Sequence, residues 1–160
     1  MDRLRSSIEA AEIECKAHGV PITRKRLNVF SILLESQKAL SAYELAASYK
    51  KIFEEPLPVI TVYRVMQFLQ SKDLVHKLEI ANKFVACTSN DCNHKHGAKQ
   101  FLICNQCLKV EELTIGQQEF DELEKLIDKA GFHLNQPQLE MNCICKTCFS
   151  KTQAMQFRGD

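Results

Sequence analysis

Two Cys-x-x-Cys pairs in the second half of the 160-residue chain have the residue types and spacing of a metal site. The pairs are Cys104/Cys107 and Cys145/Cys148, and 38 positions separate Cys107 from Cys145. Tetrahedral zinc binds four thiolates at about 2.3 Å, and two close pairs from separate turns or strand ends can supply them with little backbone strain. Such a site supplies roughly 10–16 kcal/mol of apparent binding energy to a small subdomain. We therefore predict a structural zinc site at Cys104, Cys107, Cys145 and Cys148.

The composition bounds the class of protein. The first ten residues carry four charged side chains and no apolar run, so we expect neither a secretory signal nor a membrane span, and predict a cytoplasmic protein without a membrane partner. In that compartment, 8 cysteines favour metal or redox chemistry over disulfides. The net charge of +1 means that any basic DNA-binding surface must be local.

Periodicity and turn signals divide the first half into helices followed by a hairpin. A first helix ends before Gly19-Val20-Pro21, Thr23 can cap a second, and Ser41-Ala42-Tyr43-Glu44 has the capping-box form that begins a third. A fourth helix is expected over 59–71, and strands over 74–79 and 84–87. The residues expected to be buried on the helices are Leu4, Ile8, Ala11, Cys15, Leu27, Phe30, Leu34, Leu45, Tyr49, Ile52 or Phe53, Val62, Val65, Met66 and Leu69.

This order of elements indicates a winged helix-turn-helix, in which the last helix enters the DNA major groove and the hairpin lies beside the backbone. The alternative is a small helical bundle with an ordinary charged surface. Residue content favours DNA, because Arg64 can bind a guanine edge and Tyr63 offers a ring for thymine methyl groups. The candidate DNA-binding residues are Thr61, Tyr63, Arg64 and Gln67 on the fourth helix, with Arg24 and Arg26 as phosphate contacts.

The second half predicts a β-β-α-β unit. Strands are expected over 100–103 and 109–113, a helix carries apolar residues on one face, and 132–141 is expected to be extended. Both cysteine pairs fall at strand ends, so sheet formation brings them together. The apolar residues on the helix face are Phe120, Leu123, Ile127 and Ala130. Because so small a sheet has exposed edges, we predict a homodimer through this half.

Thr61-Val62-Tyr63-Arg64, a His-bearing hairpin, His94-Lys95-His96 and the Cys-x-x-Cys pairs together resemble the ferric uptake regulator family of metal-responsive repressors. The run from Ile22 to Leu27 and that from Ser41 to Leu45 are similar to the starts of that family's second and third helices. The resemblance implies an α+β fold: a winged helix-turn-helix DNA-binding domain with wing and hinge over 1–88, a small α/β dimerisation and zinc-binding domain over 89–150, and a flexible tail over 151–160.

The resemblance also implies a second, regulatory metal site. Its ligands would be His76, Cys87, His96 and Glu112, with His94, Cys92 and Glu111 as less favoured candidates. One thiolate, two imidazoles and one carboxylate suit zinc, whereas ligand sets made only of nitrogen and oxygen suit ferrous or manganous ions. Cys87, where the iron and peroxide branches carry a carboxylate or amide, favours the zinc uptake regulator branch, with two zinc ions per chain.

The function that follows is a zinc-responsive repressor. It would bind operators of zinc-uptake genes as a zinc-loaded homodimer on double-stranded DNA, and release them on depletion. An iron- or peroxide-responsive repressor of the same family is the alternative. A thiol oxidoreductase is disfavoured, because its reactive Cys-x-x-Cys lies at a helix N-terminus and no such helix is expected here. We therefore expect no enzyme and no small organic substrate. Cys15 is expected to pack on the first helix, and Cys143 could compete for the structural zinc.

Overall fold

The structure is a computed structural model that describes residues 2–17, 19–36, 38–87, 99–135 and 138–156. The chain divides into two units, Met1–Thr88 and Ser89–Asp160. Among the described residues, no helix is long and apolar enough to cross a membrane.

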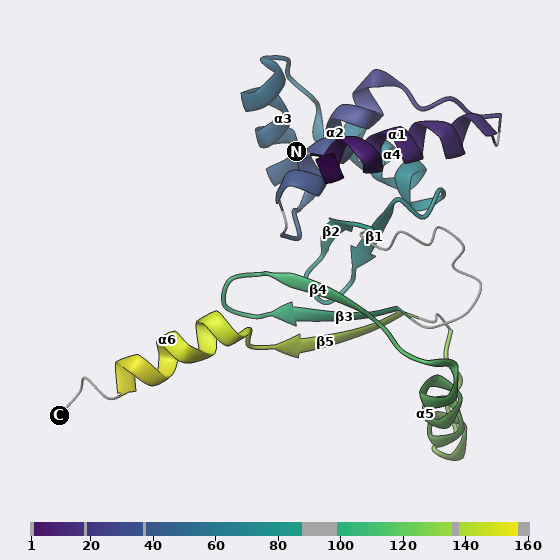
Figure 1. Cartoon of the computed structure of the whole chain (residues 1–160), viewed down its shortest axis with the longest axis vertical. Coiled ribbons are helices and arrows are strands. Elements are labelled where there is room, and N and C mark those ends of the chain that lie inside the picture. Colours follow the sequence, from purple (N-terminus) through teal and green to yellow (C-terminus); the bar gives the residue numbers. More distant parts are fainter. Residues whose placement is uncertain (1, 18, 37, 88–98, 136–137, 157–160) are drawn as a thin grey trace. The chain divides into compact units, whose positions relative to one another are not determined.

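Helices and a hairpin make up the first unit (Figure 1). Within its described residues these are α1 (Asp2–Ala17), α2 (Arg24–Ser36), α3 (Ala42–Phe53), α4 (Val59–Gln70), β1 (Val75–Leu78) and β2 (Lys83–Ala86). The two strands pair antiparallel, from Val75 opposite Ala86 to Leu78 opposite Lys83. Leu40 adds a single β-bridge to Phe84: the Leu40 N–H donates to the Phe84 carbonyl at 2.9 Å, and the Phe84 N–H donates to the Leu40 carbonyl at 2.8 Å. The segment before α3 is thereby fixed to the hairpin, and the predicted winged-helix order is confirmed.

The start of α3 is fixed by the predicted capping box. The Glu44 backbone N–H donates to Ser41 Oγ at 3.3 Å, and the Ser41 N–H donates to Glu44 Oε2 at 2.7 Å. These two bonds satisfy backbone donors that a helix start leaves without intrahelical partners. The helix ends at Glu54, which adopts the left-handed conformation with φ of 56°.

The core of the first unit confirms the predicted face of α4 and corrects that of α2. Val62, Val65, Met66 and Leu69 on α4 are all buried. Cys15 on α1 is 1% exposed and belongs to the same core, so its packing role is confirmed. On α2 the buried residues are Val29, Phe30, Ile32 and Leu33, whereas Leu27 and Leu34 are only half-buried. The single stripe expected there was wrong because α2 contacts α1, α3, α4 and β2, and so buries more than one face.

A sheet and two helices form the described part of the second unit. They are β3 (Lys99–Cys104), β4 (Val110–Thr114), α5 (Gln117–Lys129), β5 (Gln138–Cys143) and α6 (Lys146–Gln156). The strand order is β4-β3-β5, with β3 antiparallel to β4 and parallel to β5. Figure 1 shows α5 and α6 at opposite ends of this sheet. The predicted β-β-α-β order is confirmed.

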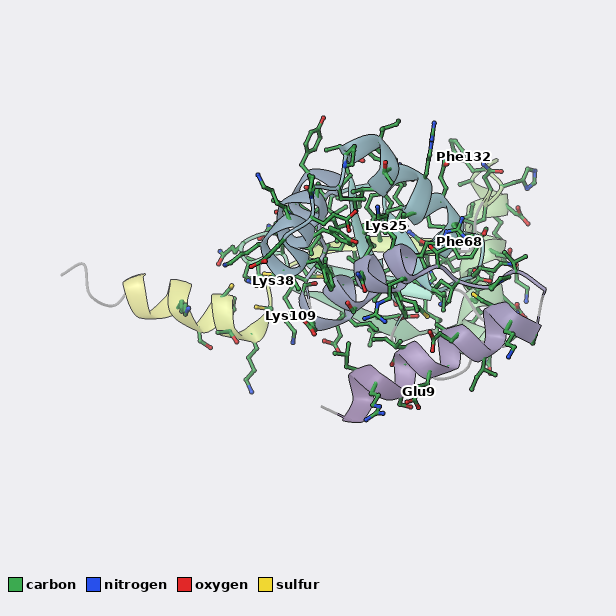
Figure 2. All side chains as sticks on the ribbon, turned by 90° about the horizontal axis from the view of Figure 1, so that it is seen from above. Glu9, Lys25, Lys38, Phe68, Lys109 and Phe132 are labelled. Atoms are coloured by element: carbon green, nitrogen blue, oxygen red, sulfur yellow. The ribbon has the colours of Figure 1, made fainter. Side chains whose placement is uncertain are left out.

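Two boundaries in the second unit differ from expectation. The extended segment expected over 132–141 is a strand only from Gln138, and Phe132, 70% exposed, lies in the turn after α5 (Figure 2). Gly131, with φ of 83°, reverses the chain there, and the Phe132 N–H donates to the Ile127 carbonyl at 3.1 Å. The flexible tail was also wrong over 151–156, since α6 continues to Gln156 through Gln, Ala and Met, which favour helix. Residues 157–160 lie outside the described part.

Candidate metal centre and nucleic-acid interface

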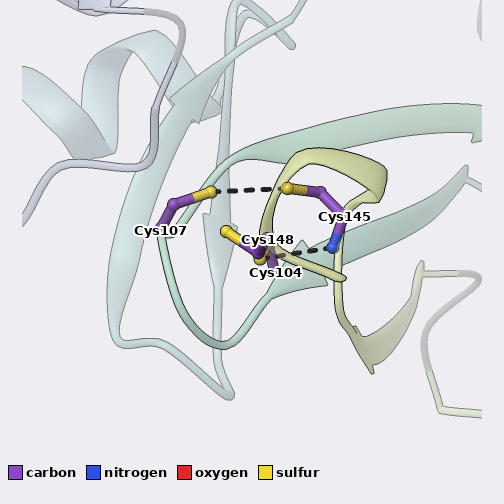
Figure 3. A group of neighbouring side chains, drawn as sticks. All are labelled: Cys104, Cys107, Cys145 and Cys148. Carbon is purple, nitrogen blue, oxygen red and sulfur yellow. Dashed lines mark hydrogen bonds between the residues drawn. The ribbon is translucent and has the colours of Figure 1, made fainter. Parts of the chain in front are cut away.

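Four cysteine sulfurs meet at one end of the sheet in the second unit (Figure 3). Those of Cys104, Cys107, Cys145 and Cys148 all lie within 4.8 Å of one another, and Cys107 Sγ is 3.7 Å from Cys145 Sγ. A zinc tetrahedron with bonds of about 2.3 Å has sulfur–sulfur edges of about 3.8 Å. The donor set therefore fits zinc in both type and spacing.

Sheet topology brings the two pairs together. Because β3 and β5 are parallel, their carboxyl ends lie side by side, with Cys104 opposite Cys143. After β3 the chain turns tightly: Leu108, with φ of 59°, donates its N–H to the Cys104 carbonyl at 2.9 Å. This turn carries Cys107 back toward the end of β5. On the other side, the Asn105 N–H donates to the Cys143 carbonyl at 3.0 Å and holds the two strand ends together.

Backbone N–H groups favour the thiolate form at two of the four cysteines. The N–H of Cys145 donates to Cys104 Sγ at 3.4 Å and, with that of Cys107, lowers the pKa of Cys104 to about 6. The N–H of Cys148 lowers the pKa of Cys145. In contrast, the hydrogen bond with Cys145 and burial raise the pKa of Cys148 to about 12. Metal binding displaces thiol protons, so a cluster with two readily ionised thiols is suited to begin capturing a cation.

The second pair lies at the start of a helix, which the sequence did not predict. α6 begins at Lys146, directly after Cys145, and the Phe149 N–H donates to the Cys145 carbonyl at 2.9 Å. The premise used against a thiol oxidoreductase was therefore wrong. The four-sulfur cluster now gives the reason against a thiol oxidoreductase, because both cysteines of the second pair face the first pair. Within the described residues the cluster does not include Cys143, so that competitor is removed.

The proposed regulatory ligands are distributed over both units. In the first unit, His76 lies on β1 and Cys87 directly follows β2, with the Cys87 N–H donating to the Leu74 carbonyl at 2.9 Å. A His76 ring nitrogen and Cys87 Sγ lie within 4.8 Å of each other. The hairpin therefore brings an imidazole and a thiol together.

Glu112 lies on β4 of the second unit, opposite Phe101, with its carboxylate 3.3 Å from Lys99 Nζ. Glu111 alternates to the other face of β4, where it is exposed and 3.5 Å from Lys109 Nζ. The two carboxylates therefore point to opposite sides, as strand alternation predicts. The candidates Cys92, His94 and His96 lie outside the described residues.

One face of α4 is exposed and carries the predicted DNA-binding side chains. Tyr63, Arg64 and Gln67 are exposed and Thr61 is half-buried. The Tyr63 ring packs edge-on against Phe84 of β2, with centroids 6.5 Å apart, so its position is fixed relative to the wing. Ile60, one turn before Arg64, is exposed on the same helix and was assigned from the sequence neither to the core nor to the DNA-binding face.

The two basic residues at the start of α2 differ in their surroundings. Arg24 is exposed, whereas the guanidinium carbon of Arg26 lies 3.5 Å from the ring centroid of Phe68 on α4 (Phe68 is labelled in Figure 2). Stacking uses the face of the guanidinium group, and phosphate oxygens are bound by N–H groups at its edge, so the two interactions are compatible. Arg26 also connects α2 to α4.

The family model described as the ferric uptake regulator family matches residues 17–142 of this chain. The chain belongs to the ferric uptake regulator family. It is 33% identical to the zinc uptake regulation protein of Escherichia coli (strain K12) over 138 residues, which cover 86% of this chain and 78% of the relative. It is 24% identical to the ferric uptake regulation protein of Helicobacter pylori (strain J99) over 151 residues, covering 92% and 95%.

Solved structures of the family share the fold. A zinc uptake regulator complexed with zinc and DNA gives a TM-score of 0.79 at 26% identity, covering 94% of this chain and 97% of that chain. The holo form of XcZur gives 0.73 at 32% identity, covering 91% and 98%. As in other members of the ferric uptake regulator family, a winged-helix domain precedes a small α/β domain, and the fold predicted from the sequence is confirmed.

Proposed function

We propose that this protein is a zinc-responsive transcriptional repressor that binds operators of zinc-uptake genes when loaded with zinc and releases them on depletion. The observation that carries the proposal is the pair formed by His76 and Cys87 on the wing, which would give a second metal site a thiol ligand. Thiolate with imidazole favours zinc over ferrous or manganous ions. The relatives named as zinc uptake regulators support the same metal.

The regulatory site is proposed to use His76, Cys87, His96 and Glu112. Two of these ligands are close together on the hairpin, and Glu112 is favoured over Glu111 by the alternation of β4. His94, Cys92 and Glu111 are the less favoured substitutes. Together with the structural cluster at Cys104, Cys107, Cys145 and Cys148, this gives two zinc ions per chain.

The DNA interface is proposed to be the exposed face of α4 inserted in the major groove. Arg64 would bind a base edge, most favourably guanine, and Tyr63 would pack beside it with its ring held against the wing. Thr61 and Gln67 complete the same face. Arg24 and Arg26 at the start of α2 are proposed phosphate contacts that position the helix without reading sequence.

A homodimer through the second unit is proposed because apolar side chains are exposed on one face of its sheet, beside Gln100 and Glu111. Strand alternation places Leu102, Leu113 and Met141 on one side of the sheet, and Leu113 and Met141 are 42% and 41% exposed. β4 and β5 are the edge strands of the described sheet. Covering this face with a second copy would bury apolar surface, and continuing the sheet across a two-fold axis would pair an exposed edge strand.

Zinc would control DNA affinity through geometry. A dimer binds two half-sites only when its recognition helices are about one DNA turn apart, or a multiple of it. We propose that the regulatory zinc ties the wing to the dimerisation domain and so fixes that distance. Turning a population from 1:99 to 99:1 takes about 5.5 kcal/mol of differential binding, and one ligand bond gained only in the DNA-competent state can supply it. Such a protein works on cytoplasmic DNA and has no catalytic role and no small organic substrate.

The decisive experiment is a titration of operator binding against buffered free zinc. Affinity should rise steeply with zinc in the wild-type protein and stay low in His76→Ala and Cys87→Ser, both of which should remain folded. Cys15→Ser is the matched control, because Cys15 is a buried core thiol on α1 and is not one of the proposed ligands. Operator affinity that is independent of zinc, or that persists in zinc-free Cys87→Ser, would remove the proposal.

Elemental analysis of the purified protein separates the alternatives. Two zinc ions per chain agree with a zinc sensor. One zinc with one iron or manganese would instead indicate the iron- or peroxide-responsive repressor, and no metal would indicate a thiol oxidoreductase.

A further inference from the structure

Ile60 is a large apolar side chain in the first turn of α4, and it is 62% exposed. It lies four positions before Arg64 and seven before Gln67, so the three side chains follow one stripe along the helix. Both of the other residues are exposed. Ile60 therefore lies at the amino end of the face that the proposed function assigns to DNA.

Packing of the first unit does not account for Ile60. The opposite face of α4 already fills the core with Val62, Val65, Met66 and Leu69. A singly exposed apolar residue is common on protein surfaces and by itself needs no explanation. What distinguishes Ile60 is its place beside Arg64, at the amino end of the helix.

That end is where recognition helices contact base edges. An aliphatic side chain cannot hydrogen-bond to bases, and the major groove offers it one apolar group, the 5-methyl group of thymine.

We infer that Ile60 contacts the methyl group of a thymine within one or two base pairs of the base bound by Arg64. This inference rests on the proposed function, since it requires that α4 enters the major groove. It assigns a specificity role at this position: thymine is preferred there because burying one methyl group favours binding by about fourfold.

The test begins with the zinc-loaded, full-length protein and a pool of random DNA duplexes, from which bound sequences are selected. In the selected duplex each thymine is then replaced singly by uracil, which removes only the methyl group. Wild-type affinity should fall about fourfold at one position in each half-site, and Ile60→Ala should show no loss at that position. Affinity of Ile60→Ala for the unmodified duplex should fall by a similar factor.

Ile52→Ala is the matched control, because Ile52 is 52% exposed in the last turn of α3, at the opposite end of that helix from its capping box. It should retain the wild-type uracil profile. Ile60→Val, which is one methylene shorter, should lie between wild type and Ile60→Ala, and provides the same comparison if Ile60→Ala does not fold.

The outcomes distinguish failure of the Ile60 contact from failure of the proposed function. If wild-type protein selects a zinc-dependent sequence but Ile60→Ala and wild type have the same uracil profile, the Ile60 contact is overturned and the proposed function stands. If zinc-loaded protein enriches no sequence, the proposed function fails and the contact fails with it.

Discussion

Lys83 on β2 donates to both carboxylate oxygens of Glu44 on α3, with distances of 2.9 and 2.8 Å. The same carboxylate accepts the Ser41 N–H of the capping box. Glu44 thus does two things at once: it completes the helix start and ties the wing hairpin to α3. Together with the Leu40–Phe84 bridge, it fixes the start of β2, next to the turn of the wing hairpin, in the first unit.

Glu44→Gln should lower the stability of the first unit. The hydrogen bond from Lys83, followed by that from Ser41, lowers the pKa of Glu44 from its ordinary value of 4.5 to about 2. Because this side chain is 47% exposed, solvent screening limits the expected loss to about 1 kcal/mol. Chemical denaturation at neutral pH measures it.

The pH dependence of that loss has a definite direction. A carboxylate whose pKa is lowered by folding stabilises the protein above its unfolded pKa, near 4.5, and this contribution is lost as pH falls toward 2. The difference between wild type and Glu44→Gln should therefore shrink as pH falls below 4.5. Glu35→Gln, at an exposed position on α2, is the control. A difference that grows on acidification would contradict the assignment.

Cys104→Ser should remove one zinc ion per chain and unfold the second unit. A complete structural zinc site supplies roughly 10–16 kcal/mol of apparent binding energy, and removing one of its four ligands removes a large part of it. Metal analysis measures the zinc loss, and limited proteolysis measures the unfolding. The first unit should stay resistant to the protease. Cys143→Ser is the matched control, because Cys143 is next to Cys104 in the sheet but outside the cluster. Equal zinc loss in both variants would show that the cluster is assigned wrongly.

Arg26→Ala and Arg24→Ala should separate packing from DNA contact. Arg26 stacks on Phe68, so its removal should cost about 1 kcal/mol of folding free energy. Arg24 is exposed, and its removal should leave stability unchanged while lowering affinity for all DNA sequences and reducing the salt dependence by about one counterion. Thermal unfolding and binding at several salt concentrations measure both. Equal stability of the two variants would rule out a structural role for the stacked Arg26.

Arg64→Ala should weaken operator binding by about 1–3 kcal/mol if Arg64 binds a base edge. Binding to random DNA should change much less. An equal loss on operator and random DNA would reduce Arg64 to a phosphate contact. Gel-shift titrations at one salt concentration on both DNAs make the comparison.

Local signals predicted the parts of the fold that depend on neighbouring residues. The capping box at Ser41, the buried face of α4 and the β-β-α-β order follow from spacing along the chain, and all are confirmed. The α2 face was wrong for a tertiary reason, and the α6 helix was missed for a local one. α2 is packed from several sides, which periodicity does not reveal, and α6 lacks the apolar stripe by which helices were identified.

The candidate sites also differ in how far local sequence signals could predict them. Four thiols in two close pairs almost define their own cluster, since each pair needs only one turn to present both sulfurs. The proximity of His76 to Cys87 depends on hairpin register, which the sequence indicated only through strand pattern. Ile60 was not identified in advance, because DNA contacts were sought among polar and aromatic side chains, and the exposure of this isoleucine is known only from the structure.

The parallel pairing of β3 with β5 also sets the order of events during synthesis. Cys145 is made 38 positions after Cys107, so the first thiol pair must wait for β5 and the start of α6 before the cluster can close. Closing a long loop before gaining contacts is slow, and parallel strands carry this delay in their topology. The supply of free zinc is therefore expected to govern how quickly the second domain matures, whereas the winged-helix domain acquires its core without it.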